Sequence, residues 1–436
     1  MPSRASSPIS SLAIFAQRHA RDARRYFDRH AYMPLPVLPG PDPGLGLVVV
    51  VPALAEPNAI STMDSVAAAS RPDCAVELLL VINAPEDAGV QLRRLNENCY
   101  REACDWVRGR HDGSLKCHVL DYCALPADHA GVGLARKLGM DIALARLAAS
   151  DSGCGIIASL DADCQVAPTY LTAVEEYFTD TPAALGATIC FEHPIDETPA
   201  ELRQAIIDYE LHLRCYKQGL AAAGSPYAHH TVGSALAVRS EIYAQEGGMN
   251  RRAAGEDFYF INKLLKRGKV GSINGTTVFP SARVSERVPF GTGAAILRAR
   301  TESQTTYAPA VYRELRLFRN ALAAFSLNDR PAPSDPVRSE PSNYAPFLDS
   351  MAFDQWLRKT RANVASVESL DSQLNRWLDG FRTMKFINWL TASRYPRVPV
   401  ADAARRILGS GGHCAAGQSQ AMLEQFRLLD RGKERV

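Results

Sequence analysis

Short apolar runs that alternate with helical segments place the strongest constraint on the fold of this chain. Residues 45–54 and 75–83 are mostly apolar, and a further run, 156–160, stands directly before Asp161. Strands that are apolar along most of their length are typical of a parallel sheet whose two faces are covered by helices. The alternation therefore predicts an α/β fold with a mostly parallel sheet flanked by helices. The expected strands are 46–52, 75–83, 116–122 and 156–160, and the expected helices are 58–70, 86–106 and 134–149.

The second half of the chain first continues this alternation and then becomes helical. Strands are expected at 184–191 and 233–239, and the Asn274-Gly275 pair predicts a short hairpin within 270–280. After residue 294 the apolar residues follow helical spacing. The pattern predicts three parts, which are a basic helix with a Pro-rich linker at 1–44, a sheet domain at 45–293 and a helical C-terminal appendage at 294–436.

The composition indicates a globular, soluble protein, because 46% of the 436 residues are hydrophobic and 22% are charged. A net charge of +2 argues against a dedicated nucleic-acid-binding protein. No apolar run reaches the roughly 18 residues of a membrane-spanning helix, and Met1-Pro2-Ser3-Arg4 is not followed by the apolar core of a signal peptide. We therefore expect a cytoplasmic protein whose ten cysteines, none in a C-x-x-C pair, are reduced thiols.

Residues 9–30 predict a basic helix, for which two interpretations stay open. Leu12, Phe15 and Tyr26 are among the apolar residues that recur at helical spacing, while the arginines lie mostly on other faces. Such a helix either packs on the sheet domain or makes a peripheral contact with an anionic membrane surface. Five prolines between residues 33 and 44 predict an extended linker after it.

Two carboxylates separated by one small residue follow the run 156–160. Ligands of open α/β sheets bind at the carboxyl ends of the strands. Asp161 and Asp163 would be costly there without a positive partner, and a divalent cation that also binds phosphate oxygens would provide one. The alternative is an Asp that caps a helix, followed by a solvated Asp.

Four stretches together resemble the family 2 glycosyltransferases, nucleotide-sugar enzymes of the GT-A fold. Residues 50–57 resemble their opening strand and turn, residues 131–139 their glycine-rich helix start, and residues 160–163 their metal motif. Gly247-Gly248-Met249, followed by Gly255-Glu256-Asp257, is similar to the block that holds the catalytic base. The four stretches occur in the order of the family and at similar spacings.

The resemblance spans roughly residues 45–290 and implies a GT-A-like sheet and an inverting, metal-assisted glycosyltransferase. Asp163 would bind Mn²⁺ or Mg²⁺, with Asp161 sharing the metal or holding the ribose. Asp257 would be the general base, and Glu256 would raise its pKa by like-charge proximity. The implied partners are a nucleotide-sugar donor and a saccharide, lipid or other hydroxyl acceptor. The expected donor-binding residues are Pro52, Glu56, Asn83, Arg136, Asp161, Arg283 and Arg287.

The chain departs from the family pattern at three points. Lys137 stands where the family has an Asn, and Asn83 stands where many members have an Asp that contacts the nucleoside. No histidine lies between His230 and His413, so the metal would rest on Asp163, the diphosphate and water. The Gln-x-x-Arg-Trp motif of processive polysaccharide synthases is not present.

Other interpretations stay open for the chain and for its motifs. A sugar-nucleotide nucleotidyltransferase or a catalytically silent nucleotide-sugar-binding scaffold would use a similar sheet. Glu256 and Asp257 would also suit a helix start through the helix dipole, and Arg136 is either a phosphate ligand at a helix start or a surface residue. The loop 283–293 is either a lid over the diphosphate or a solvated loop. His229 and His230 are structural or acceptor-facing residues, or metal ligands.

Overall fold

The computed structural model describes residues 8–110, 115–150, 155–252, 255–283, 291–299, 301–327, 344–409 and 418–432. Its contacts divide the chain into two compact units. The first consists of Met1–Pro199 and Thr231–Ala294, and the second of Ala200–His230 and Ala295–Val436. The three ranges expected from the sequence, 1–44, 45–293 and 294–436, stay a prediction about separately folding parts.

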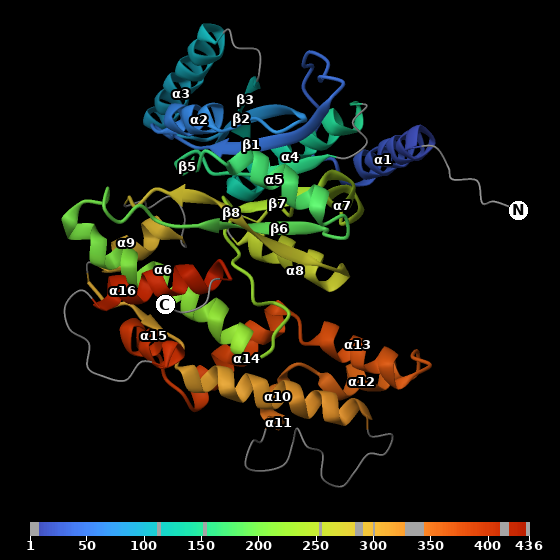
Figure 1. Cartoon of the computed structure of the whole chain (residues 1–436), viewed down its shortest axis with the longest axis vertical. Coiled ribbons are helices and arrows are strands. Elements are labelled where there is room, and N and C mark those ends of the chain that lie inside the picture. The colour runs from blue at the N-terminus through green and yellow to red at the C-terminus, as the bar shows by residue number, and fades with distance from the viewer. Residues whose placement is uncertain are drawn as a thin grey trace, which may run out of the picture. The chain divides into compact units, whose positions relative to one another are not determined.

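The first unit is built on an eight-stranded sheet of the described residues, with the order β3-β2-β1-β4-β7-β6-β8-β5 (Figure 1). Strand β1 lies between β2 and β4 and is parallel to both. The pairs β2–β3 and β6–β8 are also parallel, whereas β7 is antiparallel to β4 and β6, and β5 is antiparallel to β8. The strands are β1 (Leu45–Ala53), β2 (Ala75–Pro85), β3 (Lys116–Leu125), β4 (Ile156–Ser159), β5 (Cys164–Val166), β6 (Gly186–Phe191), β7 (Leu236–Arg239) and β8 (Val270–Pro280).

Helices flank this sheet, which confirms the expected α/β class with a mostly parallel sheet. Every residue of β1 is buried, because Val48 and Val50 pack in one cluster with α4 while alternate residues point to the opposite face. Full burial of such side chains stabilises the fold by about 1.5–3 kcal/mol each. The helices of this unit are α1 (Pro8–His30), α2 (Ala59–Ala68), α3 (Val90–Gly109), α4 (Val132–Ala148), α5 (Tyr170–Asp180), α7 (Ser240–Gln245) and α8 (Glu256–Arg267).

The N-terminal helix α1 packs on the sheet domain, as one of the two interpretations expected. Ala23 and Tyr26 are buried in the same cluster as Val48 and Val50. The Tyr26 hydroxyl donates a hydrogen bond of 2.5 Å to Asp141 on α4, and Lys137 donates to the same hydroxyl. This contact gives Lys137 a structural partner at the position where the family carries an Asn.

The expected hairpin within 270–280 is wrong. Residues 270–280 form the single strand β8, which continues past Asn274 and Gly275 with an irregularity in its pairing to β6. The first part of β8 pairs with β6 and its end pairs with β5, so the sheet supplies partners on both sides. These partners favour an extended path through a dipeptide that would otherwise form a turn.

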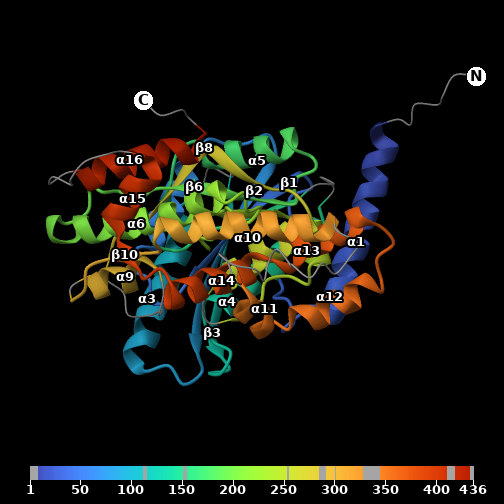
Figure 2. The same ribbon diagram turned by 90° about the horizontal axis from the view of Figure 1, so that it is seen from below.

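The second unit is helical, as expected for the C-terminal region. Phe318, Phe347 and Phe386 pack with Tyr344 in its core, where the rings of Phe318 and Phe386 stack with centroids 4.4 Å apart. Figure 2 shows α10 running along α13 and α14. This unit also contains a short antiparallel strand pair, formed by β9 (Thr305–Thr306) and β10 (Val398–Pro399). The helices are α6 (Ala200–Ala222), α10 (Pro309–Leu327), α11 (Ala345–Ser350), α12 (Phe353–Arg361), α13 (Val367–Trp377), α14 (Gly380–Ser393), α15 (Val400–Leu408) and α16 (Gln418–Asp430), and α9 (Thr292–Ala299) crosses the unit boundary.

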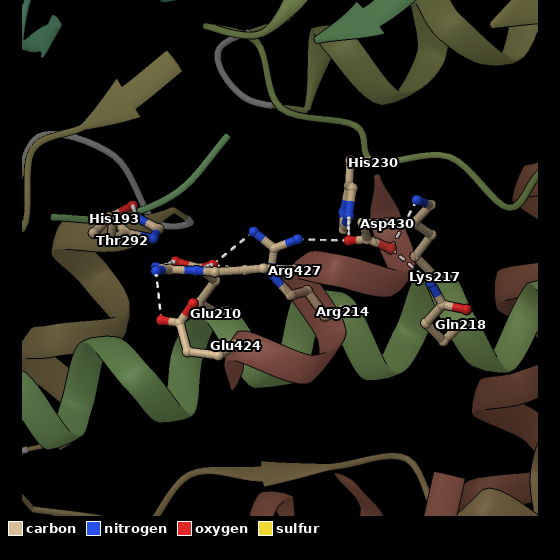
Figure 3. A network of polar contacts seen from close by, with 10 residues as sticks. All are labelled: His193, Glu210, Arg214, Lys217, Gln218, His230, Thr292, Glu424, Arg427 and Asp430. Carbon is tan, nitrogen blue, oxygen red and sulfur yellow. Dashed lines mark hydrogen bonds and ion pairs between the residues drawn. The ribbon is translucent and has the colours of Figure 1, made fainter. Parts of the chain in front are cut away.

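A buried ionic cluster fixes α16 to α6 (Figure 3). Asp430 lies 2.6 Å from Arg214 Nη1, 2.8 Å from Lys217 Nζ and 2.7 Å from His230 Nε2. Glu210 accepts hydrogen bonds from both Arg214 and Arg427. His230 therefore has a structural carboxylate partner. No helix among the described residues has the length and apolar character needed to cross a bilayer.

Candidate functional site

The candidate site lies at the carboxyl ends of β1, β2 and β4. The chain first adds β2 and β3 on one side of β1, and then places β4 on the other side. Ligands of open α/β sheets bind at such a switch in strand order. A cavity of about 490 Å³ is found here, and its walls include Pro52, Asn83, Asp161 and Asp163.

The turn after β1 is fixed by two buried asparagines. Asn83 Nδ2 donates a hydrogen bond of 2.9 Å to the carbonyl of Ala53. Asn96 on α3 donates to the carbonyl of Asn83 at 2.9 Å and accepts from the amide of Ala55 at 2.7 Å. Ala55 has a φ of 46°, a left-handed conformation that non-glycine residues rarely adopt. These hydrogen bonds stabilise the turn, whose residues line the cavity.

Arg283 connects the β1 turn to the motif after β4. Its guanidinium forms an ion pair with the buried Glu56, and the same Nη2 atom lies 3.4 Å from Asp163 Oδ2. Glu56 also accepts a hydrogen bond of 3.0 Å from the amide of Asn58, one residue before α2 begins. Glu56, Asp163 and Arg283 thus meet at one wall of the cavity, although 227 residues separate Glu56 from Arg283.

Arg136 connects the same motif to the start of α8. This arginine is only 1% exposed and does not line the cavity. Its Nη2 atom lies 2.6 Å from Asp161 Oδ1, and its Nη1 atom forms an ion pair with the buried Glu256. A Cβ atom on Gly233 would lie 2.7 Å from the guanidinium, so a larger residue there would displace the arginine from this position.

Asp257 lies beside this ion pair and is half-buried. Its carboxylate accepts hydrogen bonds from the amides of Phe258, at 2.6 Å, and Gly233. Burial raises the pKa of Asp257, Arg136 opposes this rise, and the negative charge of Asp161 adds to it. A carboxylate with a raised pKa is a stronger base than an ordinary one. The expected like charge thus comes from Asp161, while Glu256 is engaged with Arg136.

The cavity carries an excess of negative charge. Four of its described lining residues are acidic, namely Glu56, Asp87, Asp161 and Asp163, whereas Arg283 alone is basic. Among the described residues, no three histidine, cysteine or acidic side chains come close enough together to hold a metal ion. A cation bound here would need further ligands from a substrate or from water, as Mg²⁺ commonly has.

The structure thus brings six of the expected residues to the cavity or its wall, namely Pro52, Glu56, Asn83, Asp161, Asp163 and Arg283. Arg136, Glu256 and Asp257 adjoin Asp161, and Arg287 lies outside the described residues, as does most of the loop 283–293.

Sequence reasoning missed Asp87, Asn96 and Gly233. Asp87 follows the end of β2 by two residues, so the rule about carboxyl ends of strands would have found it. Asn96 and Gly233 act through contacts with distant segments, and the sequence carries no signal for them.

Comparisons with known proteins give no family assignment. No protein-family profile and no curated protein matches the chain. Among solved structures, the chain is similar to S. aureus TarS 1-349 in complex with UDP-GlcNAc, with 12% identity and a TM-score of 0.38 over 85% of this chain and 93% of that one. It is also similar to the mannosyltransferase PcManGT from Pyrobaculum calidifontis in complex with GDP-Man and Mn²⁺, with 13% identity and a TM-score of 0.37 over 97% and 95%. Likenesses this distant carry no inference about activity.

Proposed function

We propose that this chain is a metal-assisted, inverting glycosyltransferase that moves a sugar from a nucleotide-diphosphate donor to an acceptor hydroxyl. The observation that carries the proposal is the approach of Asp257 to Asp161, which lines the strand-end cavity together with Asp163. These three carboxylates come from two stretches about 100 residues apart in the sequence. Arg136 links the two stretches through Asp161 and Glu256.

The charge of the cavity supports a divalent cation. A nucleoside diphosphate is an anion, and four acidic lining residues would repel it if only Arg283 opposed them. Asp161 and Asp163 both line the cavity, with side chains 39% and 30% exposed. Because Asp161 also pairs with the buried Arg136 at 2.6 Å, we assign the cation first to Asp163. Asp161 would share the cation or hold the ribose. When bound, Mn²⁺ or Mg²⁺ supplies Lewis-acid stabilisation of the leaving diphosphate oxygen.

The remaining groups fit the other needs of glycosyl transfer. The acceptor oxygen forms a bond to the anomeric carbon while the bond from that carbon to the diphosphate breaks. Asp257 takes the acceptor proton, which its raised pKa favours. Asn83, Pro52 and Glu56 would form the wall for the nucleoside, and Arg283 would pair with the diphosphate. With Asp257 as the base and the acceptor oxygen as the nucleophile, direct displacement inverts the anomeric centre.

The stereochemistry of slow donor hydrolysis tests this proposal without a known acceptor. The chain is incubated with Mn²⁺ and a panel of α-linked nucleotide sugars, and proton NMR records the released sugar before it mutarotates. We expect the β anomer first from the accepted donor. Release of the α anomer would contradict inversion, and binding without release would indicate the silent scaffold. Conversion of the nucleotide sugar and labelled pyrophosphate to labelled nucleoside triphosphate and sugar 1-phosphate would instead indicate a nucleotidyltransferase.

A further inference from the structure

A second cavity in the first unit has the opposite charge to the candidate site. It encloses about 600 Å³, and its walls come from the end of α1, from α4, from α8 and from the loop that precedes α8. Figure 1 shows α1 beside α4 and α7, which contact it. Among the described residues, no aspartate or glutamate lines this cavity. Its basic lining residues are Arg29, His30, Lys137, Arg251, Arg252 and Lys263.

Several of these cations are held in place without being neutralised. The guanidinium of Arg251 lies over the ring of Tyr32, 5.0 Å from its centroid, and that of Arg252 lies 4.0 Å from the centroid of Tyr259. Lys263 Nζ donates a hydrogen bond of 3.3 Å to the carbonyl of Glu246. Within the described part of the chain, neither arginine forms an ion pair with a carboxylate. Aromatic and carbonyl partners orient the charges and leave them available to an anion.

Lys137 also lines the cavity, but unlike the other basic lining residues that the structure describes, it is buried and paired with a carboxylate. It is 4% exposed, its Nζ atom lies 3.1 Å from Asp141 Oδ2, and it donates a hydrogen bond to Tyr26. Close packing of α1 closes this side, because a Cβ atom on Gly248, whose φ is +72°, would lie 2.3 Å from the Tyr26 hydroxyl. The packing of α1 therefore fixes the buried Lys137 beside the exposed Arg29, Arg251 and Arg252.

We propose that this basic cavity binds the phosphate group of a small organic phosphate without a metal ion. Arginine forks suit phosphate oxygens, and an isolated set of cations costs free energy through mutual repulsion until an anion enters. A cavity of about 600 Å³ is larger than phosphate alone requires and leaves room for an organic group. The phosphate belongs either to a soluble metabolite or to a phospholipid headgroup. The proposal does not depend on glycosyl transfer.

Calorimetric titration of the full chain with pyrophosphate and with glycerol 3-phosphate, in EDTA, tests the site. EDTA removes the cation that the acidic cavity would need. We expect binding that weakens at least tenfold in the double variant Arg251→Gln/Arg252→Gln and weakens with added salt. The control Arg358→Gln/Lys359→Gln removes two exposed charges from α12 in the second unit and should bind as the unaltered chain does. Arg283→Gln, in the acidic cavity, should also leave this binding unchanged.

Three results would overturn the proposal. These are no binding of either probe by the unaltered chain, undiminished binding by the double variant, and loss of binding in Arg283→Gln. Matched melting curves exclude unfolding, and the exposed Lys263→Gln provides a second variant if the double variant is unstable.

Co-sedimentation identifies the source of the phosphate. Vesicles of phosphatidylcholine with and without phosphatidic acid are compared for the unaltered chain and the double variant. Sedimentation that requires both phosphatidic acid and the two arginines supports the site with a lipid headgroup as ligand. Binding of the soluble probes without sedimentation supports it with a soluble organic phosphate.

Discussion

At the scale of single residues, Arg136 is the connection on which the candidate site depends. Its buried guanidinium lies between Asp161, after β4, and Glu256, at the start of α8. Two carboxylates so close would otherwise repel each other and the nearby Asp257. The arginine therefore permits three acidic side chains to share one site, and the room left by Gly233 permits the arginine.

The neighbours Glu256 and Asp257 should respond differently to neutralisation. Asp257→Asn removes the proposed base, so kcat should fall by about 10²–10⁴-fold with little change in donor Kd. An acid at a helix start contributes only about 0.3–1 kcal/mol, so stability should change little. Glu256→Gln leaves part of the buried charge of Arg136 unpaired and should destabilise the fold by about 3 kcal/mol. Kinetics and urea unfolding of both variants provide the measurement.

The opposite pattern would exchange the roles of the two residues. Near-normal turnover in Asp257→Asn, together with a large kcat loss in a folded Glu256→Gln variant, would make Glu256 the base.

The sequence predicted which residues belong to the site better than it predicted which residues contact one another there. Asp161 and Asp163 follow an apolar run, and a strand end is where ligands bind, so their place could be predicted. Arg283 could be named as a cation but not as the partner of Glu56, since the two are 227 positions apart in the sequence. Such pairs depend on how distant segments approach, which local patterns do not encode.

At the scale of elements, α6 carries a histidine, His212, whose protonation should change the stability of the second unit. His212 Nδ1 lies 2.8 Å from the Thr306 hydroxyl on β9. Burial lowers the pKa of His212 to about 4, and the positive charges of Arg397 and Arg298 add to this effect. The folded unit therefore favours the neutral form of the His212 side chain over the protonated form.

Acidification should weaken the fold through His212. The folded pKa of about 4 lies below the ordinary value of 6.5, so this contribution is complete above pH 6.5 and is lost as pH falls toward 4. At pH 5 the loss is about 2 kcal/mol at most. Urea unfolding at pH 7 and pH 5 should therefore show a smaller decline for His212→Gln than for the unaltered chain. Equal declines in both proteins would remove His212 from the account.

Helices and strands with a clear periodicity of apolar residues could be predicted from the sequence. Features that depend on pairing within the sheet or on contacts with distant segments could not. The apolar runs predicted β1 and β2, and the basic periodic segment predicted α1. The sequence left open whether α1 packs on the domain, because its buried Tyr26 bonds to Asp141 more than 100 residues away. The hairpin at Asn274-Gly275 was wrong because pairing with β6 and β5 outweighs a local turn preference.

At the scale of the whole molecule, two cavities of opposite charge occur in one unit of a nearly neutral chain. The net charge of +2 gave no sign of this separation, because acidic and basic residues balance in the sum. Two cavities of opposite charge would bind anions in two different ways. In the proposed function the acidic cavity would need a cation to hold a diphosphate, whereas the basic cavity would bind an anion without one.

Titration calorimetry of UDP and GDP with and without Mn²⁺ tests the central claim most directly, because that claim is metal-assisted binding of a nucleoside diphosphate at the strand-end carboxylates. We predict that at least one nucleotide binds the unaltered chain only with Mn²⁺, that Asp163→Ala abolishes this binding, and that the exposed control Asp105→Ala retains it. Metal-dependent binding that persists unchanged in Asp163→Ala would contradict the account.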